Sequence, residues 1–267
     1  MNLERPFQIG IVSYLNVQPL IWQFRNQPDL VTITPEVPRH LADSLYNGAY
    51  DSAIVPVFEA LRHPGYYTYI PGAAIAATGP VDSVMLYSSC PFEKITQVYL
   101  DASSLTSVNL FKVIAAEHGQ KVEFRSTGHT AVPNPLPAGA AWVVIGDPAI
   151  AQRGQHPFTY DLAGMWVEHT NLPFVFAAWL VPHSRNPVGL GTMLREAREW
   201  GTEHLPEIAD AAAQHFGTTP EFALNYFSNS LHFELGEKEM QGWRHFGKLC
   251  HKHGLIPSVP EIRPFEG

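Results

Sequence analysis

The stretch FQIGIVSYLNVQP, residues 7–19, decides the fold. Its apolar start predicts a buried β-strand, the residues from Ser13 to Asn16 form a polar turn, and Pro19 begins a helix. The first N–H groups of a helix lack partners within the helix, and open α/β sheets bind ligands where strand ends face such groups. The sequence therefore predicts a binding site at the end of this strand.

The same pattern, an apolar strand followed by polar residues, recurs at three further places. These are Asp82-Ser83, Leu100-Asp101 and Ile145-Gly146-Asp147. Because the loops that follow parallel strands meet at one edge of a sheet, we expect several of them to close on one small anionic molecule.

The composition argues against several classes of partner. Of the 267 residues, 45% are apolar and 16% are charged, an ordinary globular balance, and the net charge of −8 argues against nucleic acid. No run approaches the roughly 20 apolar residues of a bilayer span, so no membrane partner is expected. Nothing at the N-terminus resembles a secretory segment, and Cys90 and Cys250 form no CxxC pair. We expect a cytoplasmic protein with two reduced, non-catalytic thiols.

The first third of the chain reads as alternating strands and helices. After the opening strand and the helix at Pro19, a strand is predicted at 31–37, a helix at 39–47 and a buried strand at 51–57. This order implies parallel pairing with right-handed crossovers. A further strand at 81–88 indicates a passage from one lobe to another.

A second series of strands and helices follows, before the chain returns. It comprises a strand at 97–101, a helix at 107–118, a loop rich in proline and glycine at 127–139 and a short apolar strand at 141–145. The last predicted elements are a buried strand at 174–181 and helices at 188–200, 203–216, 220–229 and 238–253.

This order of elements predicts an α/β, two-lobed fold like that of the type II periplasmic binding proteins. Each lobe is expected to be a mostly parallel sheet flanked by helices, and two hinge crossings join the lobes. The predicted division assigns residues 1–86 and 178–267 to the first lobe and 87–177 to the second. In this architecture the ligand lies between the lobes, and closure excludes water.

Two groups of polar residues are the leading candidates for ligand contact. The amide of Asn16 suits a hydroxyl or a carboxylate, with an Asx turn as the alternative. In the run DASSLTS, residues 101–107, four hydroxyls surround a helix start that has no nearby Lys or Arg. One hydroxyl is expected to cap the helix, and a second to contact an anion together with free N–H groups. The four residues are Ser103, Ser104, Thr106 and Ser107.

Three further candidates also have structural interpretations. Ser83 lies at the first crossing, where its hydroxyl either reaches a ligand or bonds its own strand. Asp147 either touches the ligand or caps the helix that begins at Pro148, and the cap is favoured. Asn171 either offers an amide at the second crossing or belongs to an ordinary turn.

No metal or cofactor is expected. The thirteen histidines lack ligand spacing, since His251 and His253 point to different helix faces and the HExxH motif is absent. The GxGxxG, P-loop and GxSxG motifs are also absent, so neither a nucleotide site nor a serine-hydrolase site is indicated.

Read in order, six motifs resemble one enzyme family, the chorismate dehydratases of the futalosine route to menaquinone. The motifs are IGIVSYLNVQPL, YDSAIVPVFEAL, GPVDSVMLYS, LDASSLTSVNL, VVIGDPAI and YDLAGMWVEHTNLPFVFAAW. The resemblance implies a cytoplasmic hydro-lyase that eliminates water from chorismate, its small-molecule substrate, to give 3-[(1-carboxyvinyl)oxy]benzoate. It implies no cofactor.

By motif position, the resemblance implies that Asn16 and Ser83 are the catalytic pair. Thr106 and Ser107 match the helix start that binds a carboxylate. We expect the substrate-binding residues to be Ser13, Tyr14, Ser104, Thr106, Ser107, Asp147 and Asn171. One departure is Val57, where the family has a serine after the Val-Pro pair, so a ligand contact made by that hydroxyl is in doubt here.

The chemistry of the substrate indicates where the proton goes. The motifs offer carboxylates only at Asp82, Asp101, Asp147 and Asp161, and none is a convincing strong base. We therefore expect the substrate's own side-chain carboxylate to take the proton. Two other functions remain open, a carboxylate-binding protein and the sister enzyme that forms 1,4-dihydroxy-6-naphthoate; the missing secretory segment argues against the first and the SYLN and DSV patterns against the second.

Overall fold

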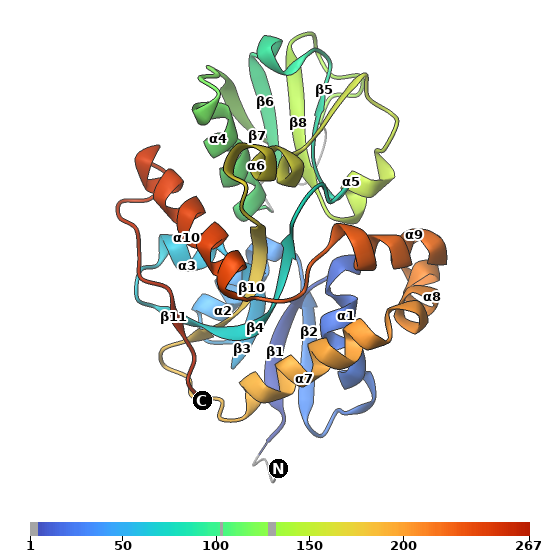
Figure 1. The fold of residues 1–267 in the computed structure, drawn as a ribbon, viewed down its shortest axis with the longest axis vertical. Helices are drawn as coiled ribbons and strands as arrows, with labels where there is room; N and C mark the ends of the chain where they lie inside the picture. The colour runs from blue at the N-terminus through green and yellow to red at the C-terminus, as the bar shows by residue number, and fades with distance from the viewer. Residues whose placement is uncertain (1–4, 102–103, 128–131) are drawn as a thin grey trace.

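Strand β1 (Phe7–Val12) has both faces covered, because five of its six residues are buried. That burial explains its apolar run, which is typical of parallel strands between layers of helices. The computed structural model describes residues 5–101, 104–127 and 132–267 (Figure 1). The sheet that contains β1 has the order β11-β4-β10-β3-β1-β2. Its other strands are β2 (Val31–Glu36), β3 (Ser52–Pro56), β4 (Tyr67–Ala77), β10 (Phe174–Pro182) and β11 (Arg263–Pro264).

Pairing in this first sheet is parallel where the sequence predicted it. Strand β1 pairs in parallel with β2 and with β3, whereas β10 runs antiparallel between β3 and β4. Strand β10 is thus the strand on which the chain comes back from the other half of the molecule.

A second sheet of five strands lies at the other end of the molecule (Figure 1). Its order is β7-β6-β8-β5-β9, and β5 runs antiparallel to both of its neighbours. The strands are β5 (Val84–Ser88), β6 (Gln97–Asp101), β7 (Glu123–Thr127), β8 (Ala140–Ile145) and β9 (Phe158–Asp161). Both sheets are therefore mixed: in each, all strands but one run in the same direction, and the reversed strand carries the chain between the two halves.

Helices accompany both sheets. With the first sheet lie α1 (Gln18–Ile21), α2 (Pro38–Tyr46), α3 (Phe58–Arg62), α7 (Leu190–Glu203), α8 (Leu205–His215), α9 (Pro220–Asn225) and α10 (Glu237–Lys252). With the second lie α4 (Thr106–Glu117), α5 (Asp147–Ala151) and α6 (Leu162–Thr170). Short 3-10 turns at Leu15–Val17, Trp22–Asn26 and Phe92–Lys94 and a π-turn at Tyr226–Ser230 complete the helical elements.

The two crossings lie a few residues ahead of the predicted boundaries at 86 and 177. Strand β5 belongs wholly to the second sheet and β10 wholly to the first, so the chain crosses at 78–83 and again at 171–173. The strand predicted at 81–88 begins only at Val84, because Asp82 has a left-handed φ of 61° that no strand accommodates. We propose that each sheet with its helices forms one lobe.

Away from the crossings, helix α10 holds the two lobes together. The ring of Phe246 on α10 lies 6.0 Å from Trp166 of α6 and 5.1 Å from Phe174 of β10. Further along α10, the Lys252 Nζ atom donates a 2.7 Å hydrogen bond to Glu117 at the end of α4. The ion pair lowers the pKa of Glu117 to about 2, so this contact persists as a salt bridge at neutral pH.

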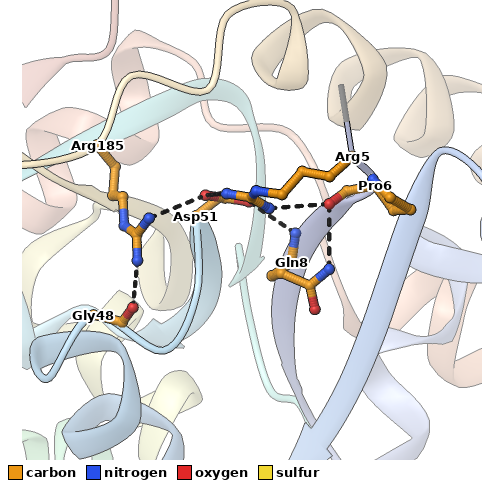
Figure 2. A network of polar contacts seen from close by, with 6 residues as sticks. All are labelled: Arg5, Pro6, Gln8, Gly48, Asp51 and Arg185. Carbon is orange, nitrogen blue, oxygen red and sulfur yellow. Dashed lines mark hydrogen bonds and ion pairs between the residues drawn. The ribbon is translucent and has the colours of Figure 1, made fainter. Parts of the chain in front are cut away.

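A buried carboxylate joins the start of the chain to the first sheet. Asp51 accepts hydrogen bonds of 2.7 and 2.8 Å from Arg5 and one of 2.9 Å from the Gln8 N–H, and Arg185 approaches from the other side (Figure 2). Burial alone would raise the pKa of Asp51, but these hydrogen bonds and the two guanidinium charges outweigh it and hold the pKa below its ordinary value.

We expect Asp51→Ala to lower the free energy of unfolding by about 3 kcal/mol, because it leaves the Gln8 N–H and two guanidinium groups without their acceptor. Since the folded pKa is depressed, the contribution of Asp51 is present above its ordinary pKa and is lost as the pH falls through the lowered value. Urea denaturation at pH 7 and pH 3 measures both effects. The matched control is Asp43→Ala, an exposed acid in a 3.4 Å pair with Arg62; equal losses for the two variants would contradict the prediction.

Candidate active site

A cavity of about 60 Å³ lies between the two sheets, at the end of β1 and beside β5 and β10. Six lining residues carry polar groups, namely Tyr14, Asn16, Ser83, Ser104, Thr106 and Ser107. Within the described part of the chain, no lining residue carries a formal charge. A bound anion would therefore be held by hydroxyl, amide and N–H donors.

Asn16 presents an unused acceptor to this cavity. It lies in the 3-10 turn after β1, anchored by the buried side chains of Leu15 and Val17. The Asn16 Oδ1 atom is buried and has no hydrogen-bond partner, so it does not form the Asx turn considered as the alternative. A buried acceptor without a partner is costly unless a ligand supplies the donor. Asn16 is therefore suited to accept a hydrogen bond from a ligand hydroxyl.

Ser83 is held at the first crossing by two partners. Its side-chain oxygen accepts a 2.7 Å hydrogen bond from the phenol of Tyr226, and its carbonyl accepts one of 2.7 Å from the Gly146 N–H. Burial raises the pKa of Tyr226 above its ordinary value, and hydrogen bonds with Ser83 and Asn16 act in the opposite direction. The phenol therefore keeps its proton at neutral pH and serves as a donor.

The carboxylate of Asp161 fixes the backbone that precedes Ser83. Its Oδ2 atom accepts 2.7 Å hydrogen bonds from the N–H groups of Val81 and Asp82, and its Oδ1 atom caps α6 through the Gly164 N–H. Burial raises the pKa of Asp161, and the three N–H donors oppose that rise. Because its oxygens face these donors, Asp161 is a structural acid and no base for the cavity.

The start of α4 supplies the largest group of donors. Ser104, Thr106 and Ser107 are buried and line the cavity, whereas Ser103 lies outside the described residues. The expected hydroxyl cap is wrong: the N-cap residue is Leu105, which makes no side-chain cap bond. The first N–H groups of this 12-residue helix have no intrahelical partner, so they face the cavity with a partial positive charge. Together these groups can bind a carboxylate.

Thr106 also connects the two lobes. Its Oγ1 atom accepts a 3.2 Å hydrogen bond from the Phe58 N–H at the start of α3. Since the hydroxyl oxygen accepts from the protein, its own proton is available to a ligand in the cavity.

Tyr14 and Asp147 close the mouth of the cavity from opposite lobes. The Tyr14 ring lies against Gly146, where a Cβ would sit 3.0 Å from a ring carbon. The Asp147 Oδ1 atom accepts a 3.2 Å hydrogen bond from the Leu15 N–H, next to Asn16. Asp147 does not cap α5, whose N-cap is Gly146. The favoured cap interpretation is therefore wrong, because the Asp147 carboxylate accepts instead from the Leu15 N–H across the lobes.

We expect Asp147 to make the stability of the protein depend on pH. Burial raises its pKa to about 6, although the Leu15 N–H opposes the rise. Its stabilising contribution is thus full below the ordinary pKa near 3.8 and is lost as the pH rises through about 6, by up to about 3 kcal/mol. Asp147→Asn keeps an acceptor without charge, so its melting temperature should exceed that of the wild type by several degrees at pH 7 and by little at pH 4. An equal difference in melting temperature between Asp147→Asn and the wild type at the two pH values would contradict the raised pKa of Asp147.

Three predicted site residues, Ser13, Asp147 and Asn171, and the Val57 departure lie outside the cavity lining. Ser13 is exposed, and its hydroxyl donates to the Glu36 carbonyl on β2. Asn171 is exposed and ends α6 with a left-handed φ of 55°. Val57 is fully buried and its N–H bonds to Phe176, so a serine there would not line this cavity.

Several residues in or behind the cavity wall escaped the sequence interpretation. Tyr226 lies in a predicted helix with no local signal of function, and a π-turn brings its hydroxyl to Ser83, although Tyr226 itself does not line the cavity. Ile75, Phe176 and Leu231 give the cavity an apolar wall, but each one reads as ordinary core in the sequence. Only the π-turn distinguishes Tyr226 from an ordinary helix residue, and no sequence pattern predicts that turn.

Neither a metal centre nor a membrane-spanning helix occurs in the described residues. Nowhere in these ranges do three or more His, Cys, Asp or Glu side chains gather as a metal ion requires. Similarly, none of the described helices combines the length and apolar character needed to cross a bilayer.

Comparison by sequence identifies relatives along nearly the whole chain. Residues 7–252 match the model of a family described as menaquinone biosynthesis. The chain is also similar to the chorismate dehydratase of Thermus thermophilus, with 30% identity over 279 residues that cover 97% of this chain and 99% of that protein.

Comparison by structure confirms the predicted fold class. A crystal structure of an Archaeoglobus fulgidus protein matches with a TM-score of 0.73 and 12% identity, over 96% of this chain and 100% of that one. The periplasmic aliphatic sulphonate binding protein of Escherichia coli matches with a TM-score of 0.68 and 12% identity, over 99% and 95% of the two chains. At such low identity these likenesses show the fold alone, which is that of the periplasmic binding proteins.

Proposed function

The chain belongs to the menaquinone biosynthesis family, and on this premise we propose that it is a chorismate dehydratase. The reaction removes one hydrogen and the neighbouring hydroxyl from chorismate and gives 3-[(1-carboxyvinyl)oxy]benzoate and water. The observation that carries the proposal is the match to the Thermus thermophilus enzyme along nearly the whole of both chains. The uncharged, donor-rich cavity between the lobes supports it.

The chemistry of chorismate sets what such a cavity must do. The hydrogen on the carbon that bears the enolpyruvyl ether is conjugated, through a ring double bond, to the ring carboxylate. Its removal leaves a dienolate with charge on that carboxylate, and loss of the neighbouring hydroxyl then forms the benzene ring. Preorganised donors that face the developing charge lower the barrier of such a step.

The donors at the start of α4 match the ring carboxylate. The hydroxyls of Thr106 and Ser107 and the unpaired N–H groups of the first turn converge there without a cation. Neutral donors suit this role because they stabilise charge without neutralising it in the ground state. We assign the departing hydroxyl or the ether oxygen to Asn16 and Ser83, which also line the cavity.

No carboxylate side chain occurs among the described lining residues. Asp161 faces backbone N–H groups and Asp147 faces Leu15. We therefore keep the hypothesis that the enolpyruvyl carboxylate of the substrate removes the ring hydrogen. It lies within the same molecule, so the protein contributes a bound conformation and a dry cavity. The proton then leaves with the hydroxide as water. A cytoplasmic location also stays a prediction.

Ultraviolet spectroscopy tests the function directly. Purified protein mixed with chorismate should convert the cyclohexadiene spectrum into a benzoate-type spectrum, without added metal or cofactor. A carboxylate-binding protein of the same fold would bind chorismate in a calorimeter and leave its spectrum unchanged. That second outcome would overturn the proposal.

A further inference from the structure

Tyr226 is a fully buried phenol that the reaction scheme above does not use. It is 1% exposed and lies in the π-turn after α9, at a point where this segment reaches the first crossing. Its hydroxyl donates a 2.7 Å hydrogen bond to the Ser83 side chain, across 143 residues of sequence. Tyr226 therefore bonds Ser83 and also interacts with Asn16, the two residues expected to be catalytic, without lining the cavity itself.

The direction of this hydrogen bond decides what Ser83 can do. A serine hydroxyl both donates and accepts, so in water it has no fixed polarity. Here the Ser83 oxygen accepts from Tyr226, and the structure gives its own proton no acceptor among the described residues. Because Ser83 lines the cavity, that proton is directed at the ligand.

The backbone of Ser83 cannot turn to avoid this arrangement. The N–H groups of Val81 and Asp82 are held by Asp161, and the Ser83 carbonyl is held by the Gly146 N–H. Ser83 can thus change only by rotation about its Cα–Cβ bond, and the hydrogen bond from the Tyr226 phenol prevents that rotation.

We propose that Tyr226 is a positioning residue that turns Ser83 into an obligate donor toward the departing hydroxyl of the substrate. The unpartnered Asn16 Oδ1 then accepts the proton of the same hydroxyl, so the leaving group is bound by one donor and one acceptor. Tyr226 keeps its own proton throughout. This inference rests on the proposed dehydratase function.

Steady-state kinetics on chorismate test the proposal through Tyr226→Phe. Because negative charge develops on the departing oxygen only in the transition state, we expect kcat to fall about 10- to 100-fold while KM changes less than about threefold. The matched control is Tyr87→Phe, which removes another fully buried phenol that donates a 2.7 Å bond, in this case to the Ala149 carbonyl. Its kcat and KM should stay at wild-type values even if both variants lose stability.

A double-mutant cycle separates positioning from a general structural effect. If Tyr226 acts through Ser83, Tyr226→Phe should lower kcat no further in a Ser83→Ala background. Independent, multiplicative losses would overturn the proposal, and so would a Tyr226→Phe enzyme with full kcat. A wild-type protein that leaves chorismate unchanged contradicts the proposed function instead.

Fluorinated tyrosines at position 226 keep the test decisive if Tyr226→Phe does not fold. They retain the hydroxyl, and each fluorine makes the phenol a stronger donor. We expect kcat to rise with the acidity of the phenol when Ser83 is present, and to be flat in the Ser83→Ala background. A flat response in the presence of Ser83 would overturn the proposal.

Discussion

Asn16→Ala is expected to lower kcat for chorismate about 10²- to 10³-fold, the range found when one preorganised polar group is removed from an active site. The Asn16 Oδ1 atom is buried without a partner, so in the free protein its desolvation is uncompensated. A ligand hydroxyl that donates to it recovers that lost hydrogen bond, and in doing so is oriented for departure. Measurement of kcat and KM by ultraviolet spectroscopy checks the prediction.

Ser13→Ala is the matched comparison, because Ser13 lies three residues earlier in the same polar turn. Its hydroxyl is bonded to the Glu36 carbonyl outside the cavity, so we expect rates within about twofold of the wild type. If Asn16→Ala keeps near-normal turnover, its assigned role is wrong. If Ser13→Ala loses as much activity as Asn16→Ala, the loss comes from the conformation of the whole loop, and the specific role assigned to the Asn16 side chain is contradicted.

Gly146→Ala is expected to lower kcat/KM about 10- to 100-fold. Gly146 has φ of 66° and ψ of −151°, a region that only glycine occupies without strain. A Cβ would also lie 3.0 to 3.1 Å from three carbons of the Tyr14 ring, which comes from the other lobe. The added methyl group therefore forces Tyr14 and the Asp147 contact apart, and the mouth of the cavity stays open to water.

Gly154→Ala controls for backbone strain alone. Gly154 has a φ of 74°, but no atom lies within 4 Å of its Cβ position. We expect both alanine variants to melt at lower temperature and only Gly146→Ala to lose kcat/KM. Small-angle scattering with product bound should show Gly146→Ala to be less compact than the wild type. Equal kinetic effects of the two substitutions would contradict a role of the Tyr14–Gly146 contact in closure.

The order of strands and helices could be predicted from local patterns. The apolar runs of β1, β3, β8 and β10 mark strands that are covered on both faces, and the helix starts at Pro38 and Thr106 carry the expected polar or proline residues. Strands β4, β7 and β9 and helices α3 and α6 were not predicted, and β7 lacks an apolar pattern because its residues are mostly exposed. The strand predicted at 81–88 begins later than predicted, because the left-handed Asp82 interrupts a run that reads as a continuous strand.

Local sequence patterns were sufficient to predict the fold class, the donors at the start of α4 and the polar ends of β1 and β5, because periodicity and helix starts are properties of neighbouring residues. The tertiary structure alone decided which of these groups share a cavity. It joins Leu15 to Asp147 across 132 residues and Ser83 to Tyr226 across 143, and it turns Ser13 and Asn171 away. Both pairings depend on how the two lobes pack, and the second also depends on the π-turn at Tyr226–Ser230. A pattern of neighbouring residues cannot predict a hydrogen bond between residues so far apart in the sequence.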